Sequence, residues 1–401
     1  MRQSNFVSAV LAGAVVLALV LVVPRGASAG QARSFGLPSP LVDINAPGGR
    51  LADGRTAPKV NVYLPDGFNR KSKKGYPVLY LLHGANGGTD SWIPTFERFF
   101  ENFKGIVVAP DGGVFGMYVN WWNGGKRAGP AWASYHLGVL RREIERRYPI
   151  RKGRRWHAIG GISMGGQGTL RYAAMLPGYF GAAVGLSPAV PDMQSQAAQI
   201  GINVLPLAGG AEGVSYDAVF GPPDGYWAEG NSPMALAPNF GHTRIYVTAG
   251  DGTNCPQDPE TPNLSLDALT ESQISAQIEP FADAVRARGA DVTAVITCGV
   301  HTFGVWDRAI VAARKWGFFR PVAEHPVKWA YRTVAASGDM WGFHFRFAKP
   351  STVVAGLRRN GKRLAASGSG RVRLTGLKCR LNLKLPFKVK LGRKCNPVGK
   401  R

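Results

Sequence analysis

Short apolar runs alternate with amphipathic stretches over most of the chain. Apolar runs bounded by Gly, Pro or polar residues predict buried strands, and apolar residues spaced by three or four predict helices. Strands are predicted at residues 60–64, 76–82, 105–110, 180–187, 243–249 and 291–298, with a further strand just before Ser163. Helices are predicted at residues 132–148, 169–175, 268–288 and 302–318. This alternation predicts an α/β fold with a mostly parallel sheet that helices cover on both faces.

The pattern changes near residue 321. Basic and apolar residues alternate from residue 371 to 391, which is the period of a strand with one buried and one solvated face. Glycines at positions 368, 370 and 392 supply turns. We therefore predict a main α/β domain over residues 30–320 and a small, basic, β-rich C-terminal module, such as a sandwich, over residues 321–401.

The N-terminus has the pattern of an export signal. Arg2 supplies a positive charge, residues 6–23 are apolar, and Ala27-Ser28-Ala29 offers a small-residue cleavage site. We predict a signal peptide over residues 1–29 and a secreted or cell-envelope-associated protein. The alternative is an uncleaved membrane anchor, since the apolar run is near the length needed to span a bilayer.

Export changes the interpretation of the four cysteines, because disulfides form and persist outside the cytoplasm. Cys255 and Cys298 lie near the ends of two predicted strands, and Cys379 and Cys395 both lie in the basic module. We predict pairing within each of these two regions, with pairing across the regions as the alternative. No C-x-x-C or His-x-x-x-His spacing indicates a metal site, and no cofactor is expected.

The positive charge is concentrated in the C-terminal module. The formal net charge is +24, and residues 321–401 hold 19 Lys or Arg residues against only Glu324 and Asp339. An exported protein meets anionic envelope polymers and lipid headgroups before nucleic acid, so no nucleic-acid partner is expected. The module is interpreted either as a tether to anionic cell-envelope polymer or as a sheet with a solvated basic face.

Candidate chemistry centres on Ser163. Gly161, Ser163 and Gly165 form a G-x-S-x-G pattern between the predicted strand and helix, and such a turn holds the serine hydroxyl clear of the backbone. A nucleophilic serine needs a base and an acid to orient that base. His301 is predicted to be the base, because it follows the last strand of the sheet and precedes the last helix. The residues themselves leave the acid open among Asp251, Asp258, Glu260, Asp267 and Glu271.

An oxyanion hole would complete this site. Two backbone N–H groups are expected to form it: that of Met164, directly after the nucleophile, and one from the loop His83-Gly84-Ala85. The predicted chemistry is acyl transfer from a small-molecule or lipid ester.

Several short motifs together resemble the esterase D and antigen 85 (mycolyltransferase) group of α/β-hydrolases between about residues 40 and 320. They are residues 81–84, 161–166, 219–223 with Trp227 and 231–233, and 300–301 with Trp306. The resemblance implies an α/β-hydrolase fold, a catalytic triad of Ser163, His301 and Glu271, and oxyanion donors at Ala85 and Met164. Glu271 is implied because the family's acid lies ten residues before an aromatic residue or leucine, here Phe281. Asp267 is the second choice.

Two departures from antigen 85 affect the expected activity. His83 precedes the glycine of the oxyanion loop where antigen 85 has an acid, and Val300-His301-Thr302-Phe303 replaces its Thr-His-Ser-Trp. The expected function is therefore an exported serine carboxylic-ester hydrolase. The alternatives are an acyltransferase with a sugar or lipid hydroxyl as acceptor, its site shielded by Trp121, Trp122, Trp227 and Phe303, and a non-catalytic envelope-binding protein.

Overall fold

The computed structural model describes residues 31–93, 100, 102–127, 129–189, 191–258, 265–376 and 378–395. The predicted signal peptide lies outside these ranges. Within them, no helix has both the length and the apolar character needed to cross a membrane.

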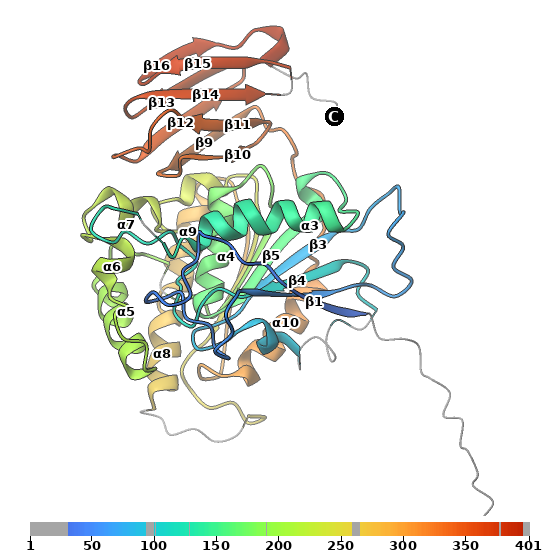
Figure 1. The fold of residues 1–401 in the computed structure, drawn as a ribbon, viewed down its shortest axis with the longest axis vertical. Helices are drawn as coiled ribbons and strands as arrows, with labels where there is room; N and C mark the ends of the chain where they lie inside the picture. The colour runs from blue at the N-terminus through green and yellow to red at the C-terminus, as the bar shows by residue number, and fades with distance from the viewer. Residues whose placement is uncertain are drawn as a thin grey trace, which may run out of the picture.

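An eight-stranded sheet forms the centre of the part of the main domain that is described (Figure 1), in the order β1-β2-β4-β3-β5-β6-β7-β8. The strands are β1 (Ala32–Gly36), β2 (Lys59–Tyr63), β3 (Val78–Leu82), β4 (Ile106–Pro110), β5 (His157–Ile162), β6 (Ala182–Leu186), β7 (Arg244–Gly250) and β8 (Asp291–Thr297). The pairs from β4 through β8 are parallel, whereas β1–β2 and β2–β4 are antiparallel. The predicted mostly parallel sheet is thus confirmed.

Helices cover both faces of this sheet because successive strand residues point to opposite sides. Tyr80 and Leu82 of β3 pack into a core shared with α3 (Arg141–Arg147), α4 (Met164–Met175) and α9 (Ile278–Arg286). Leu79 and Leu81 pack instead into a core shared with α10 (Phe303–Trp316) and η1 (Thr89–Trp92). The remaining helices of this domain are α2 (Trp132–Ser134), η2 (Tyr135–Leu140), η3 (Arg154–Trp156), α5 (Gln196–Ala208), α6 (Tyr216–Phe220), α7 (Tyr226–Gly230), η4 (Ala237–Phe240) and α8 (Leu266–Ser275).

Two predicted helices differ from their observed forms. The one expected at residues 132–148 contains the π-helical segment η2 between α2 and α3. The one expected at residues 268–288 is divided into α8 and α9. Pro280 explains the division. Proline has no N–H to donate to the carbonyl four residues earlier, so it interrupts a continuous helix, but it is tolerated in the first turn of α9.

The C-terminal strands form two four-stranded antiparallel sheets that share one apolar core. One sheet has the order β10-β11-β14-β15 and the other β16-β13-β12-β9. Their bounds are β9 (Lys328–Thr333), β10 (Ser337–Met340), β11 (Phe343–Phe347), β12 (Ala355–Asn360), β13 (Arg363–Ser367), β14 (Arg371–Gly376), β15 (Arg380–Lys384) and β16 (Phe387–Lys390), followed by η5 (Arg393–Cys395). We call this sandwich the β module.

Polar contacts join the β module to the main domain. The Arg332 guanidinium is paired with Glu229 and also donates to the carbonyl of Ala235, 2.9 Å away. Arg154 is buried and donates to the carbonyl of His242 within the main domain at 2.8 Å, and to that of Ala323, in the segment that leads into β9, at 2.9 Å. Burial lowers the pKa of Arg154 to about 10. Because this pKa is still well above 7, the guanidinium keeps its charge at neutral pH. These contacts seat the module at one end of the α/β domain (Figure 1).

Candidate active site

Ser163 lies in a sharp turn between β5 and α4. Its backbone has φ 52° and ψ −120°, a conformation that is costly for any residue other than glycine. A Cβ at Gly161 would lie 2.4 Å from the Gly165 carbonyl oxygen, and one at Gly165 would lie 2.3 Å from that of Leu82. The two glycines of the motif are therefore required sterically, and the turn places the Ser163 hydroxyl at the carboxyl end of the sheet.

His301 follows β8 and reaches Ser163 from the loop before α10. Its Nε2 lies 2.8 Å from Oγ of Ser163, and its Nδ1 lies 2.5 Å from Oε2 of Glu271. A carboxylate only accepts, so Nδ1 carries the proton and Nε2 is free to accept from the serine hydroxyl. The structure thus brings together the three side chains that the resemblance implied.

The Glu271 carboxylate is fully buried, and the protein supplies donors for both of its oxygens. Oε1 accepts from the Ser187 hydroxyl at 2.6 Å and from the Gly250 N–H at 2.5 Å. Trp306 Nε1 in turn donates to Oγ of Ser187 at 3.0 Å. Sequence reasoning did not identify Ser187. Its position directly after β6, the strand next to β5, was the available signal.

The other candidate acids lie elsewhere. The Asp267 side chain is exposed, and only its backbone carbonyl contacts His301, accepting from that residue's N–H at 3.2 Å. Asp258 forms a salt bridge with Arg308, and Asp251 accepts from Thr253. Glu260 lies outside the described residues.

Three other histidines, His157, His242 and His344, make contacts that do not involve Ser163. His157 lies between the carbonyls of Tyr179 and Arg151, and His242 donates to the carbonyl of Lys328. Burial lowers the pKa of His157 to about 4, which keeps it neutral. His344 contacts Asp339 on the β module.

The loop after β3 passes beside the nucleophile. A Cβ at Gly84 would lie 3.4 Å from that of Ser163. The backbone N–H groups of Ala85 and Met164 have no hydrogen-bond acceptor among the described residues. Met164 is also the first residue of α4, where the helix dipole favours negative charge. Both groups are therefore free to donate to a substrate oxygen.

His83 holds this loop in place. Its Nδ1 donates to the Gly84 carbonyl at 2.7 Å, and its Nε2 accepts from the Gly112 N–H at 2.8 Å. Burial lowers the pKa of His83 below its usual value, so the neutral tautomer persists. Tyr118 fixes the same segment by donating to the His83 carbonyl at 3.0 Å.

The aromatic residues considered as a shield have different environments. Trp121 is buried and donates to the carbonyl of Gly116, and Trp227 donates to that of Asn120. Trp122 packs against Trp227. Phe303 is exposed beside Trp306, two residues after His301. Of the four, only Phe303 is placed by these contacts close to the serine and histidine.

Exposed apolar side chains lie on two helices, α5 and α8. Ile200, Val204 and Leu207 lie three or four positions apart on α5, and more than half of each side chain is exposed. The end of α5 approaches the loop after β3, since a Cβ at Gly209 would lie 2.7 Å from the Asn86 side chain. Leu266 and Leu269 are similarly exposed on α8, which carries Glu271.

Both predicted disulfides are present. Cys255–Cys298 joins the segments after β7 and β8, which flank Glu271 and His301, and Cys379–Cys395 lies within the β module. The pairing within each region is therefore confirmed. The first bond ties the segment before α8, the helix that carries Glu271, to the segment before His301.

Comparisons with known proteins show the family of this chain. The model of the family described as "Putative esterase" matches residues 55–316. The esterase Rv1288 of Mycobacterium tuberculosis (strain H37Rv) is 32% identical over 262 residues, covering 61% of this chain and 53% of that protein. The chain thus spans about half the length of this curated relative.

Solved structures share the fold. The M. tuberculosis protein MPT51 (FbpC1) superposes with a TM-score of 0.53 at 21% identity, covering 73% of this chain and 100% of that one. The Staphylococcus aureus fluorophosphonate-binding serine hydrolase FphF gives a TM-score of 0.52 at 21% identity with the same coverage. The α/β-hydrolase fold expected from the resemblance is confirmed. The β module lies beyond the residues that the family model matches.

Proposed function

This chain belongs to the esterase family of α/β-hydrolases, and we propose that it is a serine carboxylic-ester hydrolase with Ser163 as nucleophile, His301 as base and Glu271 as the acid that orients it. The continuous hydrogen-bonded chain from Ser163 Oγ through His301 to Glu271, at 2.8 and 2.5 Å, carries this proposal. Nucleophile, base and orienting acid are the groups that acyl transfer requires.

The proposed reaction has two halves. Ser163 Oγ attacks the ester carbonyl carbon while His301 Nε2 takes the hydroxyl proton, and the N–H groups of Ala85 and Met164 donate to the oxygen that becomes negative. The tetrahedral intermediate collapses, and the alcohol leaves with the proton from His301. Water then attacks the acyl-enzyme by the same route, which releases the acid and restores the Ser163 hydroxyl. The Glu271 carboxylate accepts from His301 Nδ1 and stabilises the imidazolium form of His301.

The apolar side chains around the site favour an ester with an apolar acyl chain. Val204 and Leu207 on α5 and Leu269 on α8 offer exposed apolar surface that such a chain would cover. Covering apolar surface contributes about 25 cal/mol per Å². We infer that affinity rises with acyl length over the first several carbons.

An acyltransferase remains the alternative, in which a sugar or lipid hydroxyl replaces water in the second half. The exposed Phe303, which packs on Trp306 next to His301, favours it, because an apolar ring there offers a surface on which a sugar ring or a lipid chain can lie. A non-catalytic envelope-binding protein is the third reading, and the intact hydrogen-bonded chain at Ser163 argues against it.

The test uses the full-length protein and its Ser163→Ala variant with p-nitrophenyl esters, in the presence and absence of glycerol or trehalose. We expect hydrolysis by the wild type and loss of at least about a thousandfold in the variant, because the nucleophile is removed. Acyl transfer faster than hydrolysis would replace the esterase proposal by the acyltransferase. Failure of a fluorophosphonate probe to label the wild type at Ser163 would favour the non-catalytic reading.

We further propose that the protein is exported and that residues 1–29 are removed. The two disulfides support this, because such bonds are rare in reducing compartments. N-terminal sequencing of the protein from a culture supernatant is the test. A new N-terminus at Gly30 is expected, and retention of Met1 in the cell would contradict the proposal.

A further inference from the structure

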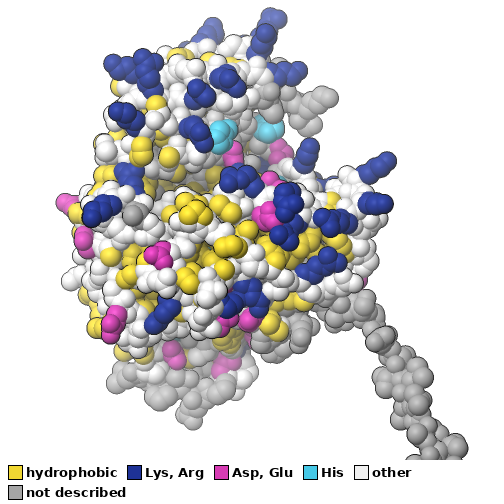
Figure 2. All heavy atoms as spheres, viewed as in Figure 1, with side chains coloured by type: hydrophobic (Ala, Val, Ile, Leu, Met, Phe, Trp, Pro, Cys, Tyr) yellow, Lys and Arg dark blue, Asp and Glu magenta, His cyan; other side chains and the backbone are white. Residues whose placement is uncertain are grey.

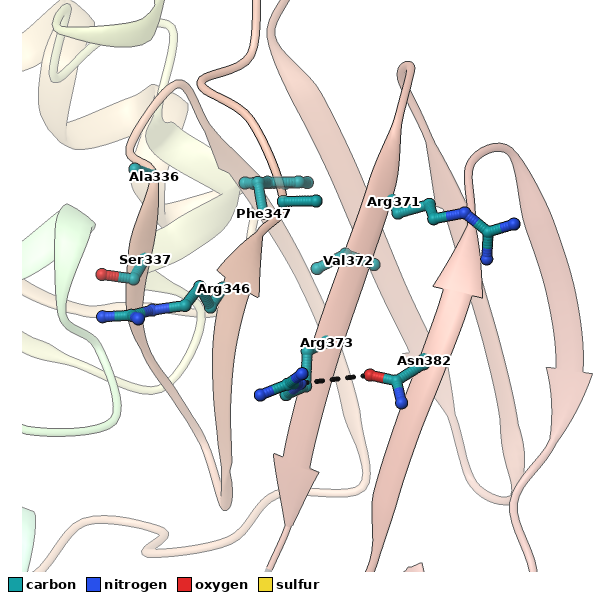
Figure 3. Close-up of a pocket in the computed structure, with 9 residues that line it drawn as sticks. Ala336, Ser337, Arg346, Phe347, Arg371, Val372, Arg373 and Asn382 are labelled. Carbon is teal, nitrogen blue, oxygen red and sulfur yellow. Dashed lines mark hydrogen bonds between the residues drawn. The ribbon is translucent and has the colours of Figure 1, made fainter.

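The outward face of the sheet β10-β11-β14-β15 contains a hollow of about 690 Å³ (Figure 3). Ser337, Arg346, Arg373 and Asn382 line it and follow one another across the four strands, since each is the register partner of the next. Arg371 lies two positions from Arg373 on β14 and also lines the hollow. Polar groups that hydrogen-bond are thus combined with guanidinium groups in one concave surface.

The charge of this face is strongly positive. Besides the three arginines of the hollow, Arg380 and Lys384 of β15 point to the same side, opposite Thr375 and Arg371 of β14. We give the name arginine face to five basic residues: Arg346, Arg371, Arg373, Arg380 and Lys384. All five are exposed, and none forms a salt bridge within the described part of the chain. Arg373 donates to the Asn382 side chain at 3.2 Å, as Figure 3 shows.

The two acids of residues 321–401 have partners other than these five basic residues, although Asp339 lies on the outward side of the same sheet. Glu324 accepts from the backbone N–H groups of Arg154 and Arg155 at 2.8 and 3.1 Å. Asp339 accepts from Arg141 and contacts His344, both at 2.9 Å. Since these are the only Asp or Glu residues after position 320, the arginine face keeps its charge uncompensated. Figure 2 shows Lys and Arg side chains spread over the visible surface of the module.

We propose that the arginine face binds an anionic polysaccharide carrying carboxylates, lying across β11, β14 and β15. Guanidinium groups bind carboxylates through paired hydrogen bonds, and Ser337 and Asn382 suit sugar hydroxyls. Neighbouring strands are about 4.8 Å apart, close to the length of one pyranose ring, so such a chain would place successive acidic sugars over successive strands. The inference does not depend on the esterase activity.

Two other polyanions fit this face less well. The outward positions of its four strands are Ser, Asp, His, Arg, Thr, Asn and Lys, with no Phe, Tyr or Trp on which a nucleic-acid base would stack. These positions also lack the aliphatic side chains that would enter a lipid surface. Charge with hydrogen-bonding groups, and without apolar anchors, favours a hydrated polymer.

The test compares two triple variants of the full-length protein with equal loss of charge. Arg346→Gln, Arg371→Gln and Arg373→Gln remove charge from the arginine face. Arg358→Gln, Lys388→Gln and Lys390→Gln remove it from exposed positions of the other sheet. Binding is measured with fluorescently labelled polygalacturonate at low salt, with dextran as the uncharged probe, and hydrolysis of a small activated ester reports correct folding.

The wild type and the control variant with changes on the other sheet are expected to bind polygalacturonate. The variant with three changes on the arginine face should lose roughly tenfold in affinity, as expected for three exposed charge pairs. High salt should weaken the wild-type complex. Equal losses in both triples would overturn the proposal in favour of non-specific attraction. Tighter wild-type binding to poly(glycerol phosphate), duplex DNA or anionic phospholipid vesicles would overturn the assignment to a carboxylated polysaccharide, as would no binding at all. Ester hydrolysis should be equal in all three proteins.

Discussion

The Ser187 hydroxyl donates a 2.6 Å hydrogen bond to the buried carboxylate of Glu271. Ser187 itself accepts from Trp306 Nε1, so its hydroxyl hydrogen is directed at Glu271. This relationship extends the proposed triad by two residues that touch neither the substrate nor His301 by a hydrogen bond. Ser187 is therefore a positioning residue for the acid, and Trp306 positions Ser187.

Ser187→Ala should lower kcat roughly tenfold with little change in KM, because a carboxylate that loses one donor holds His301 less firmly. It should also lower the free energy of unfolding by about 1 kcal/mol, since the buried Trp306 N–H loses its acceptor. Ester hydrolysis and urea unfolding measure the two effects. A rise in KM at unchanged kcat would contradict the positioning role, as would an unchanged pH profile of kcat.

Glu271→Gln should reduce kcat by about three orders of magnitude, because an amide neither stabilises the imidazolium nor holds the correct tautomer of His301. Asp267→Asn, four residues earlier on α8, is the matched control and should stay within about twofold, since its side chain is exposed. Steady-state kinetics with one p-nitrophenyl ester checks both. The reverse order of effects would assign the acid to Asp267.

Val204→Ser with Leu207→Ser should lower kcat/KM for p-nitrophenyl octanoate roughly tenfold and leave the acetate ester unchanged. The change removes apolar surface on α5 worth about 1.5 kcal/mol to a chain that lies on it. Val327→Ser with Val353→Ser removes exposed apolar side chains from the segment after residue 320 and serves as control. Similar losses on both esters would show that α5 does not contact the acyl chain.

Stability should fall as the pH drops below about 6.5. Burial lowers the pKa of His136 to about 3, although the hydrogen bond from its Nε2 to the Asp111 carbonyl acts in the opposite direction. Its Nδ1 accepts from Tyr172, so both ring nitrogens of the neutral form have partners. A histidine whose pKa is lower in the folded protein binds more protons in the unfolded chain. Its contribution to stability is therefore complete at pH values above the pKa of the unfolded chain, and it is lost as the pH falls toward the pKa of the folded protein. The slope is about 1.4 kcal/mol per pH unit between those values.

Urea unfolding of the wild type and of His136→Gln at pH 7 and pH 4.5 tests this dependence. The wild type should lose more stability on acidification than the variant, which no longer has that buried base. His157, with a pKa lowered to about 4, adds a similar slope to both proteins. Equal losses in the two proteins would show that His136 does not carry the effect.

Local patterns predicted much of the fold, because each apolar run needs a buried place and its period specifies strand or helix. The edge strand β1 was missed. Its residues 32–36 are largely exposed and Phe35 is the only large apolar residue among them, so no alternation of apolar and polar positions marks a strand there. The division between α8 and α9 was also missed, although Pro280 marks it. The serine turn and His301 could be placed because a strand, a sharp turn and a helix each have a sequence signature.

By itself the sequence predicted Ser163 as nucleophile and His301 as base, a mostly parallel sheet followed by a β-rich module, and the concentration of charge after residue 320. These depend on the order of residues and on local geometry. Only the tertiary structure decided that Glu271, rather than Asp267, reaches His301, that Ser187 and Trp306 support it, and that five basic residues of the module share one face. Contacts between distant segments depend on how the strands are ordered and paired. Where one segment holds several acidic residues, the local sequence does not show which carboxylate is buried.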